Sequence, residues 1–189
     1  NAPLAPAAVP GILDVDTGNL LSEQSVLIKD GCIKQISRTP IKAYDACMID
    51  IRGRVLMPGL CDAHIHAISA SNSFAELQRW SPFYMASRMA EILRGMLMRG
   101  FTTVRDAGGA DWGIATAIEE GYIDGPRVLF CGKALSQTGG HGDMRAPGDN
   151  LEQCVCCPGL GRICDGVTEV RKAIRDEVRE RRLSRLLPP

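Results

Sequence analysis

Two histidines, His64 and His66, stand one residue apart near the end of the apolar stretch VLMPGLCDAHIHAISA, residues Val55–Ala70. The chain holds 3 histidines in all, so most of its imidazoles lie in this one pair. Residues two apart in a strand point to the same face, which turns Ala63 and Ile65 the other way. Two neutral imidazoles on one strand end can share a divalent cation such as zinc. The spacing alone fits equally well two partly exposed histidines that bind nothing.

The third histidine, His141, lies in the glycine-rich segment SQTGGHGD, residues 136–143. Glycines allow a backbone to approach a ligand closely, so the segment could bring this imidazole to a substrate. The competing interpretation is a flexible surface histidine without a function. Four further charged residues are candidates for supporting a site, although structural ion pairs would explain them equally well: Arg105, Asp106, Asp143 and Arg145.

The elements before the histidine pair are short strands and turns. SVLIKDGCIKQI, residues 25–36, predicts a hairpin with a tight Asp-Gly turn. CMIDIRGRVLMPG, residues 47–59, repeats the theme with Gly53 as its turn. We therefore expect a small β unit over residues 10–54.

From Val55 the pattern alternates between strand and helix. FYMASRMAEILRGMLMRG, residues 83–100, carries a methionine-rich apolar stripe typical of a helix that packs on a core and ends at Gly100. Strands are predicted over residues 101–109 and 126–135, and a short helix over 112–121. A charged helix is predicted over 166–182, with one face marked by Val167, Val170, Ile174 and Val178. Three successive βα units imply a parallel sheet with right-handed crossovers, and an α/β fold class.

Composition excludes some classes of function. The 189 residues include 22 basic and 22 acidic side chains, so the formal net charge is zero. Nothing in this composition suggests a nucleic-acid partner. No apolar run approaches the roughly 20 residues that a membrane span requires, and no membrane partner is expected. The opening NAPLAPAAVPG lacks the features of a secretory signal, which favours the cytoplasm, although a chain beginning with Asn1 leaves the compartment open.

Three motifs in order resemble one family. MPGLCDAHIH at residues 57–66, GFTTVRDAGG at 100–109 and GPRVLFCGKALSQTGGHGD at 125–143 resemble the first three barrel strands of the amidohydrolase superfamily. The likeness is to the branch containing imidazolonepropionase-like enzymes, prolidase-like dipeptidases and fungal ochratoxin-degrading amidases. It extends from about Gly11 to Glu180.

The resemblance implies a fold and a site. It implies a partial (β/α)8 barrel, about the first three βα units, over residues 55–189, preceded by a small β-sandwich-like unit over 1–54. His64 and His66 match two metal ligands, with zinc favoured and one or two ions expected in a complete member. His141 matches a histidine beside the substrate, where it could polarise the scissile carbonyl. Small amides or dipeptides are the implied substrates, and a homo-oligomer is an expected assembly.

The implied activity is metal-dependent hydrolysis of an amide or peptide bond in a small carboxylate-bearing substrate, such as a dipeptide or N-acyl amino acid. The resemblance also implies later strands that carry a lysine, two histidines and an aspartate, and these have no counterpart here. Length leads to the same expectation, since a complete barrel needs about 250 residues. We therefore expect a chain truncated at its carboxyl end. The alternative is a catalytically incomplete fragment or an interaction protein with a vestigial metal site.

A third hypothesis is a metal or redox module built on Cys154, Cys156, Cys157 and Cys164, whose spacing does not match paired zinc knuckles.

Overall fold

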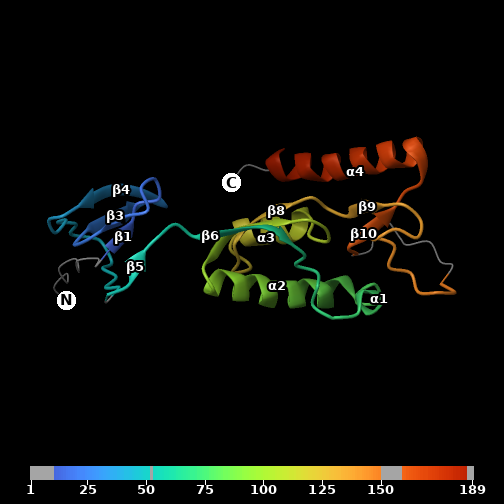
Figure 1. Cartoon of the computed structure of the whole chain (residues 1–189), viewed down its shortest axis with the longest axis horizontal. Coiled ribbons are helices and arrows are strands. Elements are labelled where there is room, and N and C mark those ends of the chain that lie inside the picture. The colour runs from blue at the N-terminus through green and yellow to red at the C-terminus, as the bar shows by residue number, and fades with distance from the viewer. Residues whose placement is uncertain (1–10, 52, 150–158, 187–189) are drawn as a thin grey trace. The chain divides into compact units, whose positions relative to one another are not determined.

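The computed structural model describes residues 11–51, 53–149 and 159–186 (Figure 1). The chain divides into two compact units, Asn1–Pro58 and Gly59–Pro189. The sequence places the boundary slightly earlier, between residues 54 and 55, and that domain assignment stays a prediction. In the described residues, no helix is both long and apolar enough to cross a membrane.

The N-terminal unit consists of two small sheets. A two-stranded sheet pairs β3 and β4, and a three-stranded sheet has the order β2-β1-β5. Its strands are β1 (Gly11–Leu13), β2 (Leu20–Leu21), β3 (Ser25–Lys29), β4 (Cys32–Ser37) and β5 (Val55–Leu56). The predicted hairpin is confirmed, because β3 and β4 are antiparallel and Lys29 lies opposite Cys32. Asp30 and Gly31 both adopt positive φ angles, 53° and 69°, as a tight primed turn requires.

The second predicted hairpin is wrong. Residues 47–51 form no strand, although Gly53 does lie in a turn with a φ of 84°. The reason is that β5 pairs in parallel with β1, Gly11 opposite Val55, so the strand after the turn takes its partner from the start of the unit.

The C-terminal unit is built on a parallel sheet, in the strand order β6-β7-β8. Two further short strands, β9 and β10, form a separate parallel pair. The strands are β6 (Leu60–Ile65), β7 (Phe101–Asp106), β8 (Arg127–Phe130), β9 (Ala134–Ser136) and β10 (Gly161–Ile163). The helices are α1 (Phe74–Leu77), α2 (Pro82–Met98), α3 (Trp112–Glu119) and α4 (Gly166–Leu186). The predicted parallel sheet with helical connections is confirmed.

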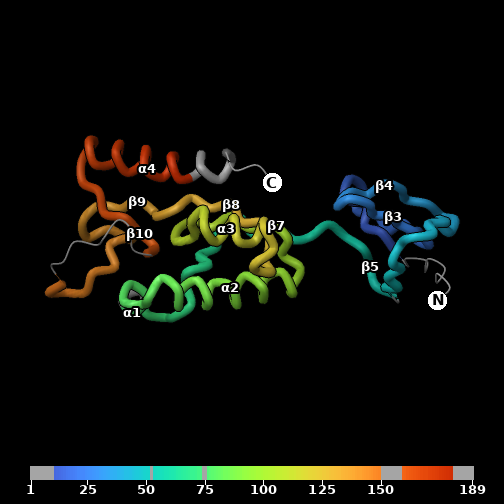
Figure 2. Tube along the Cα trace, turned by 180° about the vertical axis from the view of Figure 1, so that it is seen from behind, coloured from blue at the N-terminus to red at the C-terminus, as the bar shows by residue number. Residues whose placement is uncertain are grey.

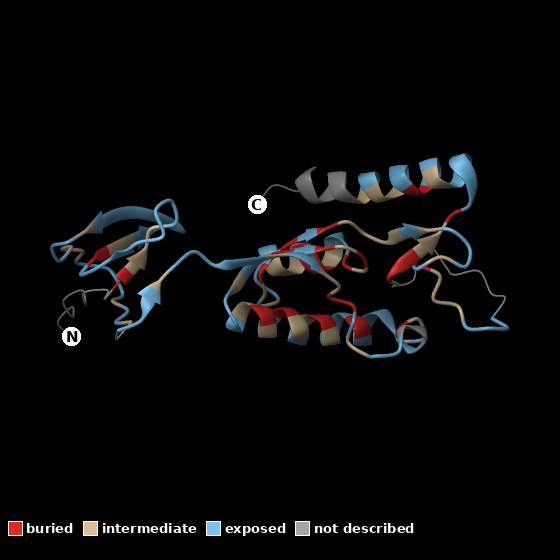
Figure 3. Ribbon diagram, viewed as in Figure 1, coloured by how far each residue is buried: buried red, intermediate tan, exposed pale blue. Residues whose placement is uncertain are grey.

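The core lies between the sheet and its helices. Helix α2 contacts β7, α3 contacts β8, and α4 contacts α3; Figure 2 shows α3 between α2 and α4. Along β7 and β8, burial alternates, with Val104, Val128 and Phe130 buried while Arg105 and Leu129 are exposed (Figure 3). One face of the sheet is therefore covered by helices and the other is open.

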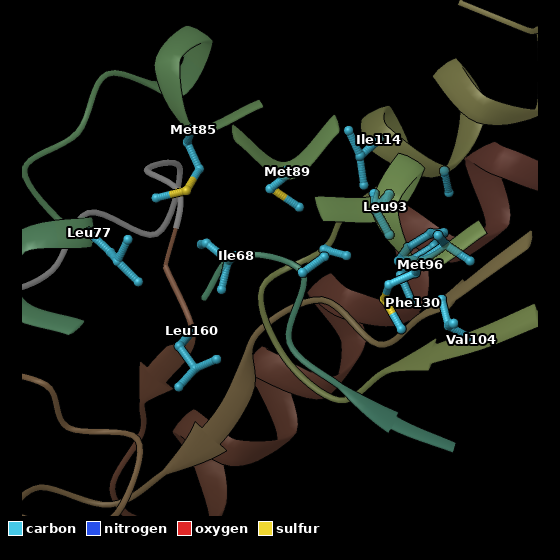
Figure 4. Packing of buried hydrophobic residues seen from close by; sticks show 14 residues of the cluster. Ile68, Leu77, Met85, Met89, Leu93, Met96, Val104, Ile114, Phe130 and Leu160 are labelled. Atoms are coloured by element: carbon cyan, nitrogen blue, oxygen red, sulfur yellow. The ribbon is translucent and has the colours of Figure 1, made fainter. Parts of the chain in front are cut away.

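Helix α2 confirms the predicted stripe. It begins with Pro82 in its first turn, a position where the missing proline N–H is not needed, and Gly100 follows its end with a φ of 95°. Its buried residues are Met85, Met89, Leu93 and Met96. These side chains pack with Ile68 and Ile114 in the cluster of Figure 4, so the methionines serve as core.

Helix α4 forms where it is predicted but buries a different face. Val167, Ile174 and Val178 are 67%, 47% and 46% exposed, whereas Ala173 is fully buried. The reason is a charged partner: on β10, Arg162 donates to Asp176 at 2.8 Å. The guanidinium of Arg162 turns the acidic side of the helix inward, which leaves Val167, Ile174 and Val178 exposed, while Val170 of the predicted face is half-buried.

Candidate functional site

The histidine pair occupies the carboxyl end of β6. Its two imidazoles meet edge to face, with ring centroids 5.1 Å apart and planes at 83°. The Nε2 atoms of His64 and His66 lie 3.3 Å apart. Ile65 between them packs against the hydrophobic core, so alternation along the strand turns both imidazoles away from it.

Backbone hydrogen bonds hold each member of the pair. His66 Nδ1 lies 3.0 Å from the carbonyl oxygen of Gly108, in the connection after β7. A carbonyl only accepts, so Nδ1 carries the hydrogen and Nε2 of a neutral His66 is left with its lone pair. At His64, the backbone N–H donates to Asp62 Oδ1 at 3.0 Å. These two hydrogen bonds therefore hold the end of β6 in the conformation that brings the two Nε2 atoms together.

Asp106, the last residue of β7, holds the backbone next to the histidine pair. Its fully buried carboxylate accepts from the backbone N–H groups of Ala67 at 2.7 Å, Gly108 at 2.9 Å and Ala110 at 3.1 Å. Burial raises the pKa of Asp106, although the three N–H donors and nearby His66 oppose that rise. The side chain joins the residue after the histidine pair to the loop that follows β7.

The separation of the pair fits a tetrahedral cation. Two imidazole nitrogens bound about 2.05 Å from a tetrahedral zinc ion lie about 3.3 Å apart, and the two Nε2 atoms have that spacing without rearrangement. Two ligands leave further positions to be filled. Among the described residues, no three His, Cys, Asp or Glu side chains gather closely enough to hold a metal ion.

His141 does not join the pair in such a group. Its side chain is exposed, in the loop between β9 and the end of the described segment at residue 149. That loop is held by Asp143, which accepts from Gly139 N at 2.9 Å and from the Arg145 guanidinium at 2.7 and 2.8 Å. Asp143 and Arg145 therefore form the structural ion pair that the sequence left open. The placement of His141 beside a substrate stays a prediction.

Arg105 and Asp106 are adjacent in sequence but take different partners. Arg105 is exposed on the open face of the sheet, and its Nη1 donates to the Ala63 carbonyl at 3.3 Å. Asp106 faces inward and binds backbone N–H groups. Sequence reasoning missed the Gly108 carbonyl, because a main-chain acceptor leaves no side-chain signature. The glycines after β7 were the signal that could have indicated a close backbone approach there.

The cysteine hypothesis is not tested by the structure. Cys154, Cys156 and Cys157 lie outside the described residues. Cys164 is a buried free thiol whose Sγ lies 4.0 Å from the Arg162 carbonyl oxygen. A role for the four cysteines stays a prediction.

Comparison with known proteins identifies the family. The model of the amidohydrolase family matches residues 55–184, which include the histidine pair and the parallel sheet of β6, β7 and β8. The chain belongs to the amidohydrolase family. Members of this family are generally metal-dependent.

One relative and two solved structures show which amidohydrolases this chain resembles. An ochratoxinase from Aspergillus niger is 35% identical over 185 residues, covering 89% of this chain and 38% of that protein. The crystal structure of a prolidase complexed with N-methylphosphonate-L-proline matches with a TM-score of 0.85 and 42% identity, covering 92% and 43% of the two chains. A Xaa-Pro dipeptidase with bound methionine, 24% identical with a TM-score of 0.68, shares the fold. This amidohydrolase chain thus spans about two fifths of the length of its relatives.

Proposed function

We propose that this amidohydrolase chain belongs to a metal-dependent enzyme that hydrolyses an amide or peptide bond. The substrate is a small molecule with a carboxylate near the scissile bond, such as a dipeptide or an N-acyl amino acid. The observation that carries the proposal is the His64–His66 pair, with Nε2 atoms 3.3 Å apart on an ordered strand end. The similar prolidase, 42% identical, is complexed with N-methylphosphonate-L-proline, a small ligand that carries a carboxylate, and this supports the substrate class.

We infer that the three parallel strands are the first part of a (β/α)8 barrel. Helices pack against β7 and β8, and the face bearing Arg105 and Leu129 is open, as the inner face of an unclosed barrel would be. The histidine pair and the loop after β7 both lie at carboxyl ends of strands. That end is where barrel enzymes carry their chemistry.

Each site residue then has a role. His64 and His66 would hold the cation through Nε2, while the Gly108 carbonyl keeps the hydrogen of His66 on Nδ1. A divalent cation bound there, with zinc favoured, supplies a Lewis acid for the amide carbonyl and lowers the pKa of water. His141 would donate a hydrogen bond to the carbonyl oxygen as negative charge develops on it.

The first experiment measures metal on the purified 189-residue chain. Elemental analysis after zinc loading and dialysis is compared between the wild type and the His64→Ala/His66→Ala double variant, with His141→Ala as the matched control. We expect bound zinc in the wild type and in the control, and at least a tenfold lower content in the double variant, because the pair supplies the two Nε2 atoms that lie close enough to share one ion. Equal zinc in all three proteins would contradict the metal assignment.

The second measurement is hydrolysis of a panel of dipeptides and N-acyl amino acids by the same three proteins. Turnover that is lost in both the double variant and His141→Ala would support the proposed enzyme. Zinc binding without turnover would favour the alternative, a catalytically incomplete amidohydrolase fragment or an interaction protein with a vestigial site. Assembly into a homo-oligomer and location in the cytoplasm stay predictions.

A further inference from the structure

We infer that Asp106 is a positioning residue that sets the hydrogen of His66 on Nδ1 and so prepares Nε2 as a metal ligand. The inference rests on the proposed metal-binding function of the pair and adds to it a residue outside the ligand set. Asp106 touches neither imidazole through a hydrogen bond. It acts through the backbone on both sides of the hydrogen bond between His66 Nδ1 and the Gly108 carbonyl oxygen.

The two carboxylate oxygens have separate tasks. Oδ2 accepts from Ala67 N, in the residue that follows His66. Oδ1 accepts from Gly108 N and Ala110 N, in the connection after β7. One side chain therefore fixes the distance between the imidazole of His66 and the carbonyl of Gly108, whose oxygen lies 3.0 Å from Nδ1.

The surrounding packing keeps these contacts away from water. Asp106 and Ala110 have no exposed surface, and Ala67 is 1% exposed. Gly109 has a φ of 112°, and a Cβ added there would overlap the side chain of Ile68, so only glycine fits at this point of the connection. A buried acceptor with three donors in a tightly packed loop holds its partners more rigidly than an exposed one.

The consequence for His66 is chemical. With the hydrogen held on Nδ1, the lone pair of Nε2 faces His64 Nε2 at 3.3 Å. Without a cation, the His64 Nε2–H can donate to that lone pair; with one, both Nε2 atoms are available as ligands. If the Gly108 carbonyl moved away, His66 could carry its hydrogen on Nε2, where it would block the site.

Asp106→Asn is the decisive variant. An amide has nearly the shape of the carboxylate but one acceptor oxygen, so it cannot serve Ala67 N and the loop N–H groups together. Asp111→Asn is the matched control five residues away. Asp111 caps α3 through Oδ1 alone, accepting from Ile114 N at 3.1 Å, and asparagine caps helices equally well.

The primary readout is the tautomer of His66, observed by ¹⁵N NMR of the imidazoles without metal at a pH where the ring is neutral. We expect the Nδ1–H form in the wild type and in Asp111→Asn, and a mixture with the Nε2–H form in Asp106→Asn. Zinc affinity, measured by competition with a chelator, should fall by about 10- to 100-fold in Asp106→Asn only. A purely structural role would leave the tautomer unchanged in the folded protein.

The outcomes separate this inference from the proposed function. The Nε2–H form in the wild type, or an unchanged tautomer in folded Asp106→Asn, would overturn the role of Asp106. Wild-type chain that binds no zinc would contradict the metal site, while the tautomer still decides what Asp106 does. If Asp106→Asn does not fold, Asp106→Ser, whose smaller hydroxyl can accept from one segment at a time, is measured in the same way and must show the same mixture.

Discussion

At the scale of single residues, several carboxylates among the described residues accept hydrogen bonds from backbone N–H groups. Asp106 binds three backbone donors, and Asp111 caps a helix. Asp143 combines both kinds of partner, since it accepts from Gly139 N and from the Arg145 guanidinium. These hydrogen bonds shape the loops after the strands, where the family places its chemistry.

The Asp143–Arg145 pair predicts a pH-dependent stability. The Arg145 guanidinium holds the pKa of Asp143 well below its ordinary value. The folded state therefore binds fewer protons than the unfolded state, and the stabilisation is complete above the unfolded pKa of about 3.9 and is lost as the pH falls towards the folded pKa. Urea unfolding should show Asp143→Asn less stable than the wild type at pH 7, with the difference shrinking at pH 3.

A matched control is Asp124→Asn. Asp124 faces Arg94 at 3.8 Å in a pair whose side chains are 77% and 64% exposed, so its removal should change stability little at either pH. A wild-type advantage over Asp143→Asn that grew on acidification would contradict the direction of the shift.

At the scale of elements, polar contacts decide how α4 is seated. Arg162 donates to Asp176, and Glu177 accepts from the backbone N–H of Lys133 just after β8. Burial raises the pKa of Glu177, opposed by that N–H group and by Arg162. The carboxylate of Glu177 lies against Gly132, where a Cβ would overlap it.

Gly132→Ala should therefore destabilise the chain by two effects. Gly132 has a φ of 80°, a left-handed conformation that alanine adopts at a cost, and the added methyl group displaces Glu177. Because the flexible end of Glu177 can move aside at the cost of its hydrogen bond from Lys133 N, together these predict a loss of about 2–3 kcal/mol in the free energy of unfolding, measured by urea titration. Gly139→Ala, with a φ of 68° and open space around it, should lose only about 1–2 kcal/mol. Equal losses would show that α4 does not press on Gly132.

At the scale of the whole molecule, the C-terminal unit leaves one sheet face uncovered. Leu129 is 52% exposed on that face, opposite Arg105 in the register of β7 and β8. In the described part of the chain, β6 and β8 each have one paired side, so the sheet has two open edges. Exposed apolar faces and unpaired edges favour association with other chains.

We therefore expect the isolated chain to self-associate through this face. Leu129→Lys should raise the concentration at which half the chains associate by about tenfold, as measured by sedimentation velocity, because it places a charge on the contact. Tyr122→Lys is the control, since Tyr122 is 80% exposed and lies in the connection between α3 and β8, outside the strands. The same shift in both variants would point to a general effect of added charge.

Local pattern was enough for much of this structure. Alternation along β6 predicts that His64 and His66 share a side, the Asp-Gly pair predicts the β3–β4 turn, and the methionine spacing predicts the buried stripe of α2. Each depends on residues a few positions apart, whose geometry the backbone dictates. The motifs around the histidines were likewise enough to indicate the amidohydrolase family.

Long-range partners decided the rest. The face that α4 buries follows from Arg162 on a distant strand, and the strand pairing of Val55 follows from Gly11 at the start of the unit. The acceptor for His66 is the main-chain oxygen of Gly108, 42 residues away. The sequence by itself determined which residues are candidate metal ligands; only the tertiary structure decided which nitrogen of His66 keeps its lone pair, because that depends on a backbone contact that no side-chain pattern records.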